Sequence, residues 1–217
     1  MKQNQWEVII LKPTPMFLTF LASQLPGVEL PNLRLLQMDS TAYVIAKQES
    51  DEDTLNEIER HFVTMFRNEI SRWIDEGARN KIEGTFLDFL CCFKFELHSQ
   101  IVFMEPKLAN GQHLIRVKPR SVLLKWLRSA IEEDSELNPV LERINLSHLA
   151  ENATVLVKSF TSLADIKSFV KNYYHTIFEA EMLRMCDKAD DWPVIDSYQA
   201  FSRYFAIDIH TQLYHLH

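Results

Sequence analysis

Three segments from the first half of the chain recur in the second half in the same order. Residues 93–101 read FKFELHSQI and residues 205–213 read FAIDIHTQL, with phenylalanine, histidine and glutamine at matching positions. Two further pairs match in their apolar pattern and in one lysine each: 8–18 with 114–124, and 42–47 with 153–158. Ordered repetition of this kind predicts a tandem duplication, so we expect the chain to fold as two similar units.

Both halves predict the same order of elements, βαββαβ. The first half is expected to contain a strand at 8–11, a helix from Thr14, strands at 33–38 and 43–46, a helix after Ser50, and a strand within 86–103. The second half is expected to contain 114–117, 122–131, 144–146, 155–157, a helix after Ser162, and a strand within 201–213. Apolar stripes at helical spacing make Phe62 and Tyr173 the expected equivalent core residues of the two later helices.

The βαββαβ order is that of the split βαβ, ferredoxin-like unit. We therefore expect an α+β fold in which each unit forms an antiparallel sheet with its helices on one face. One repeat is predicted for residues 1–104 and the other for 112–217, with 105–111 as the linker because Asn110-Gly111 is a turn signal. The open sheet faces are expected to cover one another or to bind a partner.

Composition excludes several classes of function. The chain has 217 residues, 47% of them hydrophobic, with a net charge of −7, which does not attract nucleic acid or anionic lipid as a whole. It holds four glycines and no glycine-rich phosphate loop, so no nucleotide cofactor is expected. Apolar runs are too short to insert into a membrane, and the three cysteines do not form a disulfide pattern, which favours the cytoplasm.

The repeated histidines are the first candidate catalytic residues. On each strand a carboxylate lies two positions before the histidine, as Glu96 before His98 and Asp208 before His210. Strand alternation places each pair on one face, where the carboxylate could orient the imidazole and raise its pKa. The alternative is that these residues form a polar strand face with a packing role.

One histidine in each half of a duplicated chain resembles the two-histidine phosphoesterases, which carry a His-x-Ser/Thr-x motif in each half. This resemblance implies a phosphoesterase that uses His98 and His210. Here the hydroxyl residue follows the histidine directly, as Ser99 and Thr211, so strand alternation turns it to the opposite face. Duplicated ferredoxin-like folds also occur among CRISPR RNA-processing proteins, but those use a basic surface and a glycine-rich loop.

A basic cluster in the second half is the candidate partner-binding site. Five cations fall within a stretch that contains no acidic residue: Arg116, Lys118, Arg120, Lys125 and Arg128. The matching segment of the first half shares only one lysine with it. Such a cluster could bind an acidic protein segment or a phosphate, or it could be a solvated helix edge whose lysines pair with Glu132 and Glu133.

No metal site is predicted. His215 and His217 share a strand face at the end of the chain, but two ligands do not make a site. Cys91 and Cys92 are adjacent and would point to opposite faces of a strand.

The sequence is more typical of a binding module than of an enzyme. We expect a non-enzymatic adaptor or chaperone-like protein that captures an acidic, extended or helical segment of a partner, as small acidic adaptors of bacterial secretion systems do. The alternative is a phosphoesterase or RNA-processing enzyme that uses His98 and His210.

Overall fold

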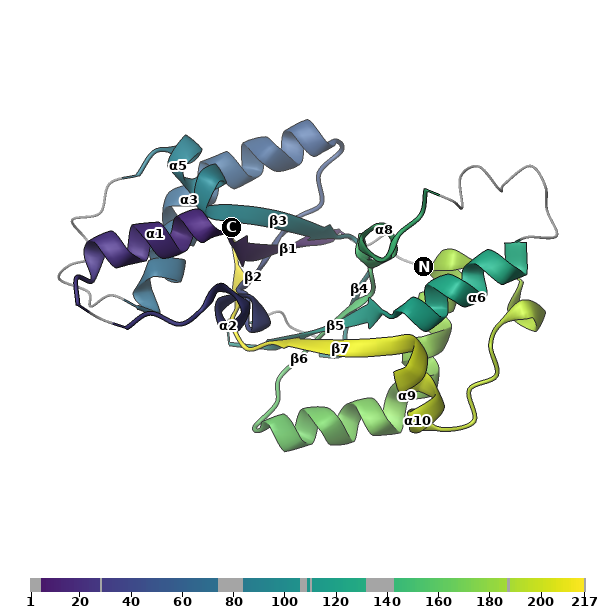
Figure 1. Cartoon of the computed structure of the whole chain (residues 1–217). Helices are drawn as coiled ribbons and strands as arrows, with labels where there is room; N and C mark the ends of the chain where they lie inside the picture. The colour runs from purple at the N-terminus through teal and green to yellow at the C-terminus, as the bar shows by residue number, and fades with distance from the viewer. Residues whose placement is uncertain are drawn as a thin grey trace.

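The computed structural model describes residues 5–27, 29–73, 84–105, 109, 111–131, 143–186 and 188–216. The first half contains β1 (Trp6–Pro13), α1 (Pro15–Gln24), α2 (Leu33–Met38), β2 (Ala42–Ala46), α3 (Asp51–Ser71), α5 (Phe86–Cys92), β3 (Phe93–His98) and β4 (Ile101–Phe103). The second half contains β5 (His113–Pro119), α6 (Ser121–Ile131), α8 (Leu146–Ala150), β6 (Val155–Lys158), α9 (Leu163–Met185), the 3-10 turn η1 (Ala189–Asp191), α10 (Tyr198–Tyr204), β7 (Phe205–His210) and β8 (Leu213–His215). The predicted α+β class is confirmed (Figure 1).

Side-chain caps explain where the predicted elements were wrong. Residues 33–38 form helix α2 rather than a strand, because the Asn32 side chain accepts a hydrogen bond from the Leu35 N–H at 3.0 Å. The predicted strand at 144–146 gives way to α8, which Asn145 caps in the same manner. Thr85 and Asp88 form a reciprocal capping box that starts α5, so the strand predicted within 86–103 begins at Phe93.

The strands form two four-stranded sheets, and each half contributes its last strand to the other half's sheet. One sheet has the order β3-β1-β2-β8 and the other has the order β4-β6-β5-β7. Strand β8 pairs parallel with β2, and β4 pairs parallel with β6. The sheets are therefore mixed, and the predicted antiparallel arrangement holds only for the three strands that each half supplies to its own sheet. Figure 1 shows the end of the chain running from β7 to lie beside β2.

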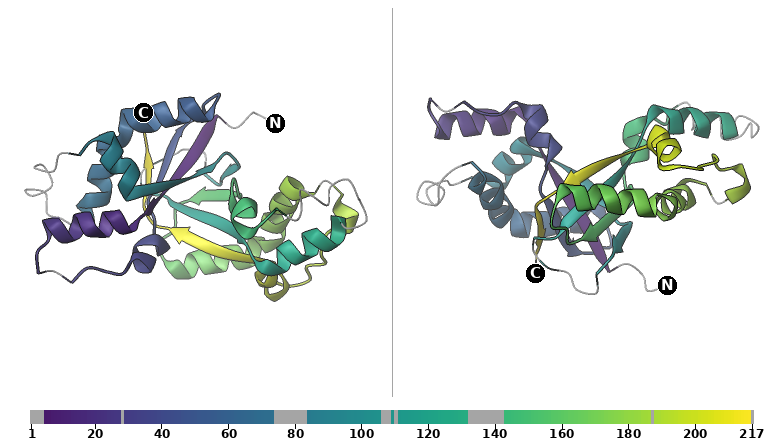
Figure 2. Two further views of the ribbon diagram at one scale, coloured as in Figure 1. Left: turned by 45° about the horizontal axis from the view of Figure 1, so that its top comes forward. Right: turned by 90° about the horizontal axis from the view of Figure 1, so that it is seen from below.

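Each sheet packs its helices on one face and the other sheet on the opposite face. In the first half, alternate β1 residues such as Ile9 and Leu11 pack against α1, α3 and α5. The intervening residues Val8 and Ile10 join Leu114 and Val155 of the second half in a separate apolar cluster. The sheet faces thus cover one another, and the helices lie on the outside (Figure 2).

The strand pairing shows which residues of the two halves occupy matching positions, and it corrects one of the matches made from the sequence. Val8 lies opposite His98, and Leu114 lies opposite His210. Ile10 pairs with Ala42 and Arg116 with Val155, so Val155, rather than Ala153, is the structural counterpart of Ala42.

The later helices also need a correction, in this case of one residue. Glu69 and Glu181 are both buried at matching places on α3 and α9, which makes Tyr174 the counterpart of Phe62. Tyr173, the predicted core residue, is 47% exposed.

The predicted linker is described only in part. Residues 106–108 and 110 lie outside the described residues, and Gly111 has the left-handed φ of +84° that suits a turn. Within the described part of the chain, no helix is both long enough and apolar enough to span a bilayer.

Candidate functional site

Both repeated histidines are buried at the junction of the halves. His98 and His210 are each 1% exposed. The Nδ1 atom of His98 lies 2.8 Å from the Ala153 carbonyl oxygen, just before β6. The Nδ1 atom of His210 lies 2.8 Å from the Ser40 carbonyl oxygen, just before β2. Each histidine therefore joins the end of its own strand to the loop that starts a strand of the other half.

The hydroxyl residue after each histidine strengthens the same junction. The N–H and hydroxyl of Ser99 donate to Asn152 Oδ1 at 2.6 and 2.9 Å. The N–H and hydroxyl of Thr211 donate to the Asp39 carboxylate at 2.8 and 2.7 Å. The repeated His-Ser/Thr pair thus holds the chain where it crosses from one sheet to the other. We call the pairs His98-Ser99 and His210-Thr211 the crossover latches.

A buried glutamate and an arginine support each latch, and the sequence interpretation missed them. Glu69 is 2% exposed and Glu181 is fully buried. Arg72 donates to the Asp39 carbonyl oxygen at 2.8 Å, and Arg184 donates to the Leu149 carbonyl oxygen at 2.8 Å. The Thr154 N–H donates to Glu181. The signal was present as a repeated Glu-x-x-Arg, EISR at 69–72 and EMLR at 181–184.

Burial makes the histidines unsuitable as general acids or bases near neutral pH. Burial lowers the pKa of His98 to about 4, and burial together with the charge of Arg116 lowers that of His210 to about 4. This reverses the raised pKa expected from the nearby carboxylates. Neither Nε2 atom has a hydrogen-bond partner among the described residues. Both imidazoles are therefore neutral at pH 7.

The two carboxylates predicted to orient the histidines bind a buried arginine instead. Arg116 is 2% exposed, and its guanidinium donates to Glu96 and to Asp208. Glu96 also pairs with Lys12. Arg116 thus forms two ion pairs, one with each carboxylate. Because Glu96 belongs to the first half and Asp208 to the second, Arg116 bridges the halves.

Beside this ion-pair cluster lies a cleft of about 810 Å³. Its lining includes Lys12, Glu96, Arg116 and Lys118, and neither histidine contributes to it. Burial, followed by the charges of Arg116 and Lys118, lowers the pKa of the Lys12 amine to about 8. The cleft is therefore a polar surface with charges of both signs, and its lining also includes Lys47 and the acidic residues Glu7, Glu49, Asp51 and Glu151.

The predicted basic cluster is divided by the structure. Arg116 is buried and paired, so it is not available on the surface. The Lys118 side chain is 48% exposed and lies 3.7 Å from the Asp208 carboxylate. Arg120, Lys125 and Arg128 are exposed. Glu132 and Glu133, the expected partners of the lysines, lie outside the described residues.

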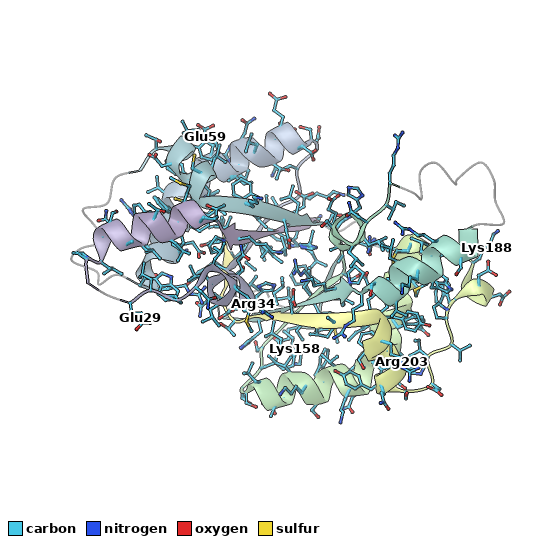
Figure 3. The ribbon with its side chains drawn as sticks, in the orientation of Figure 1. Glu29, Arg34, Glu59, Lys158, Lys188 and Arg203 are labelled. Atoms are coloured by element: carbon cyan, nitrogen blue, oxygen red, sulfur yellow. The ribbon has the colours of Figure 1, made fainter. Side chains whose placement is uncertain are left out.

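Helix α10 adds a further cation to this surface. It packs against α6 and carries the exposed Arg203, and neither helix contains an acidic residue. Figure 3 shows Arg203 at the end of the molecule formed by the second half, opposite Glu59 of the first half. We call Arg120, Lys125, Arg128 and Arg203 the α6/α10 basic surface.

The structure does not gather the other candidate ligands. No group of three or more His, Cys, Asp or Glu side chains that could hold a metal occurs among the described residues. His217 is outside them, and His215 packs edge-on against Trp6 with ring centroids 4.8 Å apart. Cys91 is exposed and Cys92 is buried in helix α5.

No protein-family model, curated protein or solved structure matches this chain.

Proposed function

We propose that this protein is a non-enzymatic protein-interaction module, an adaptor or chaperone-like protein of the cytoplasm, which binds an acidic segment of a partner. The observation that carries the proposal is the α6/α10 basic surface, on a chain whose net charge is −7. An acidic partner would be attracted to this surface and repelled by most of the remaining molecule, which favours one orientation of docking.

The corresponding helices of the first half support this assignment by contrast. Helices α1 and α5 also pack together, but α1 has no charged residue and α5 has only Asp88. The two halves therefore keep the same elements and differ in the charge of one outer surface. Such a difference indicates that the second half has acquired a specialised contact.

A role for the repeated histidines in holding the halves together also favours recognition over catalysis. Their Nδ1 atoms bind backbone carbonyls and their pKa is far below neutrality. The residues that a phosphoesterase would need for acid–base chemistry thus have structural partners.

We further propose that the two halves descend from one duplicated ferredoxin-like unit. Each half supplies three strands in the order β3-β1-β2 or β7-β5-β6, which corresponds to that unit without its second strand. A short helix, α2 or α8, replaces the second strand, and the last strand of the other half occupies its place. The repeats at 1–104 and 112–217 are the proposed copies.

The proposed function is tested by reversing charge on the α6/α10 basic surface. Arg120→Glu, Lys125→Glu and Arg128→Glu are combined in one variant, and binding to the partner that co-purifies from the native host is measured by titration. Arg116 is left intact because it is buried. The control variant combines Arg34→Glu, Arg67→Glu and Lys167→Glu, which are exposed elsewhere.

We expect the surface variant to bind at least tenfold more weakly than wild type, and wild-type binding to weaken as salt increases. The control has the same net charge and should retain wild-type affinity. Equal loss in both variants would mean that only net charge matters, and no loss in the surface variant would exclude this surface.

A further inference from the structure

Strand β3 forms one edge of its sheet, and the hydrogen-bond pattern shows which backbone groups point outward. The Thr14 N–H donates to the Cys92 carbonyl at 2.9 Å, whereas the Leu11 N–H donates to Thr41 at 3.0 Å, on the β2 side. The backbone N–H and C=O groups of even-numbered β1 residues therefore point toward β3. Since Ile10 pairs with Glu96, the backbone of Glu96 faces β1, and the N–H groups of Phe95 and Leu97 face away from the sheet.

The outward edge of β3 borders the 810 Å³ cleft, whose lining includes Phe95, Glu96, Leu97 and Ser99. Residues 47–51, helix α8 and the residues after that helix also line the cleft. Strand β7 is the equivalent edge of the second sheet, and none of its residues lines this cleft. A sheet edge beside a cleft is the arrangement into which proteins accept an added strand.

The two faces of the sheet present different chemistry to the cleft. On the face toward the other sheet lie Lys12, Arg116 and Lys118, three cations that pair with two carboxylates, Glu96 and Asp208. On the helix face, Phe95 and Leu97 pack against the first-half core, and Glu7 and Asp51 lie nearby in the lining. An acidic side chain would be attracted on the first face and repelled on the second.

We propose that this cleft binds an extended peptide segment that pairs with the outer edge of β3 and alternates acidic with apolar residues. Side chains of an added strand alternate between faces, so its acidic residues would face the partly exposed Lys12 and Lys118, and its apolar residues would pack beside Phe95 and Leu97. The peptide N–H and C=O groups would bond to the outward backbone of these two residues. The inference deepens the proposed function, because it names a second contact for an acidic partner.

The test uses a defined probe, the acetylated hexapeptide Glu-Val-Glu-Val-Glu-Val, titrated into the full-length protein with amide hydrogen exchange followed by NMR. The Phe95 and Leu97 amides should become protected when the peptide binds. The Glu96 amide already faces β1 and is the internal control, since its exchange should change little. Protection of neither Phe95 nor Leu97 at saturating peptide would overturn the proposal.

Two further peptides test the stated chemistry. Lys-Val-Lys-Val-Lys-Val keeps the alternation and reverses the charge, and Glu-Glu-Glu-Val-Val-Val keeps the composition and removes the alternation. We expect each to bind at least tenfold more weakly than the first peptide. Equal binding of the lysine peptide would exclude recognition by Lys12 and Lys118, and equal binding of the block peptide would exclude a strand.

Matched proline variants locate the contact on the chain. Leu97→Pro removes an outward N–H at the β3 edge, and Ile209→Pro makes the same change at the equivalent position of β7. Leu97→Pro should weaken peptide binding at least tenfold, and Ile209→Pro should leave it within twofold. Should Leu97→Pro fail to fold, the exchange of the wild-type amides still decides.

The outcome is separable from that of the proposed function. The Arg120→Glu, Lys125→Glu, Arg128→Glu variant leaves the cleft residues unchanged, so it should bind the hexapeptide within threefold of wild type. Loss of partner binding with retained peptide binding would support both surfaces. Retained partner binding in that variant would contradict the proposed function. The peptide measurements would then decide the cleft proposal alone.

Discussion

At the residue scale, the histidines and carboxylates that the sequence made candidate catalytic residues mostly hold the two halves together. The sequence predicted the repeated histidines and their carboxylates as one set. The structure assigns Glu96 and Asp208 to Arg116 and assigns the histidines to backbone carbonyls. Strand alternation alone could not distinguish these arrangements, because the competing partner, Arg116, comes from a different strand.

The neutral histidines predict how stability depends on pH. Their pKa is about 4 in the folded state, against 6.5 for the unfolded chain, so the unfolded state binds protons more readily. Their contribution is present above pH 6.5 and is lost as pH falls toward 4. Between pH 6.5 and 5 the loss should be about 2 kcal/mol per histidine.

Titration of Glu69 has the opposite effect on stability as pH falls, so a Glu69 variant provides a control for the histidine effect. Burial raises its pKa to about 7, so its protonation on the folded protein favours folding as pH falls over the same range. We therefore expect Glu69→Gln to make the acid destabilisation roughly twice as steep, measured by urea unfolding at pH 6.5 and pH 5. An unchanged slope in Glu69→Gln would contradict the assigned titration.

At the element scale, most helices and strands were predictable and the short ones were not. The long helices α3 and α9 follow from apolar periodicity and from Ser50 and Ser162, whose side chains accept from the N–H three residues later. The segments at 33–38 and 144–146 are short and apolar, a pattern that strands and helices share. The deciding interactions were the side chains of Asn32 and Asn145.

The crossover strands β4 and β8 could not be inferred from local pattern, because their partners lie in the other half. Asp39 holds the entry to β8 by accepting from both Thr211 groups, and it pairs with Arg72 at 3.3 Å. Asp39→Ala should free this end of β8 and increase amide exchange at Tyr214 and Leu216, whose N–H groups point toward β2. It should cost about 1–3 kcal/mol of unfolding free energy.

Asp39→Asn is the matched comparison, because the other half uses Asn152 at the equivalent position. An asparagine retains one acceptor for Thr211, so exchange at Tyr214 should stay closer to wild type. Equal exchange in the alanine and asparagine variants would show that the side chain does not hold the crossover.

At the scale of the whole molecule, exchange of strands makes each sheet depend on both halves. The predicted duplication implied that each half would complete its own sheet, whereas β8 completes the first sheet and β4 completes the second. Arg116 adds an ion-paired bridge at the centre. The halves are therefore expected to unfold together.

Single-tryptophan variants that retain only Trp73 or only Trp126 test this expectation, since these residues pack in the cores of the first and second halves. Their fluorescence transitions in urea should share one midpoint. Two separated midpoints would show that the halves are independent domains despite the exchanged strands.

The most direct test of the proposed function is site-specific photo-crosslinking in cells that make the protein. Benzoylphenylalanine is placed at Lys125 on the α6/α10 basic surface or at Lys167, an exposed lysine on α9. We predict a discrete protein adduct at position 125, with an acidic segment at the crosslinked site, and no such adduct at position 167. The absence of an adduct at position 125, or the same adducts at both positions, would contradict the account.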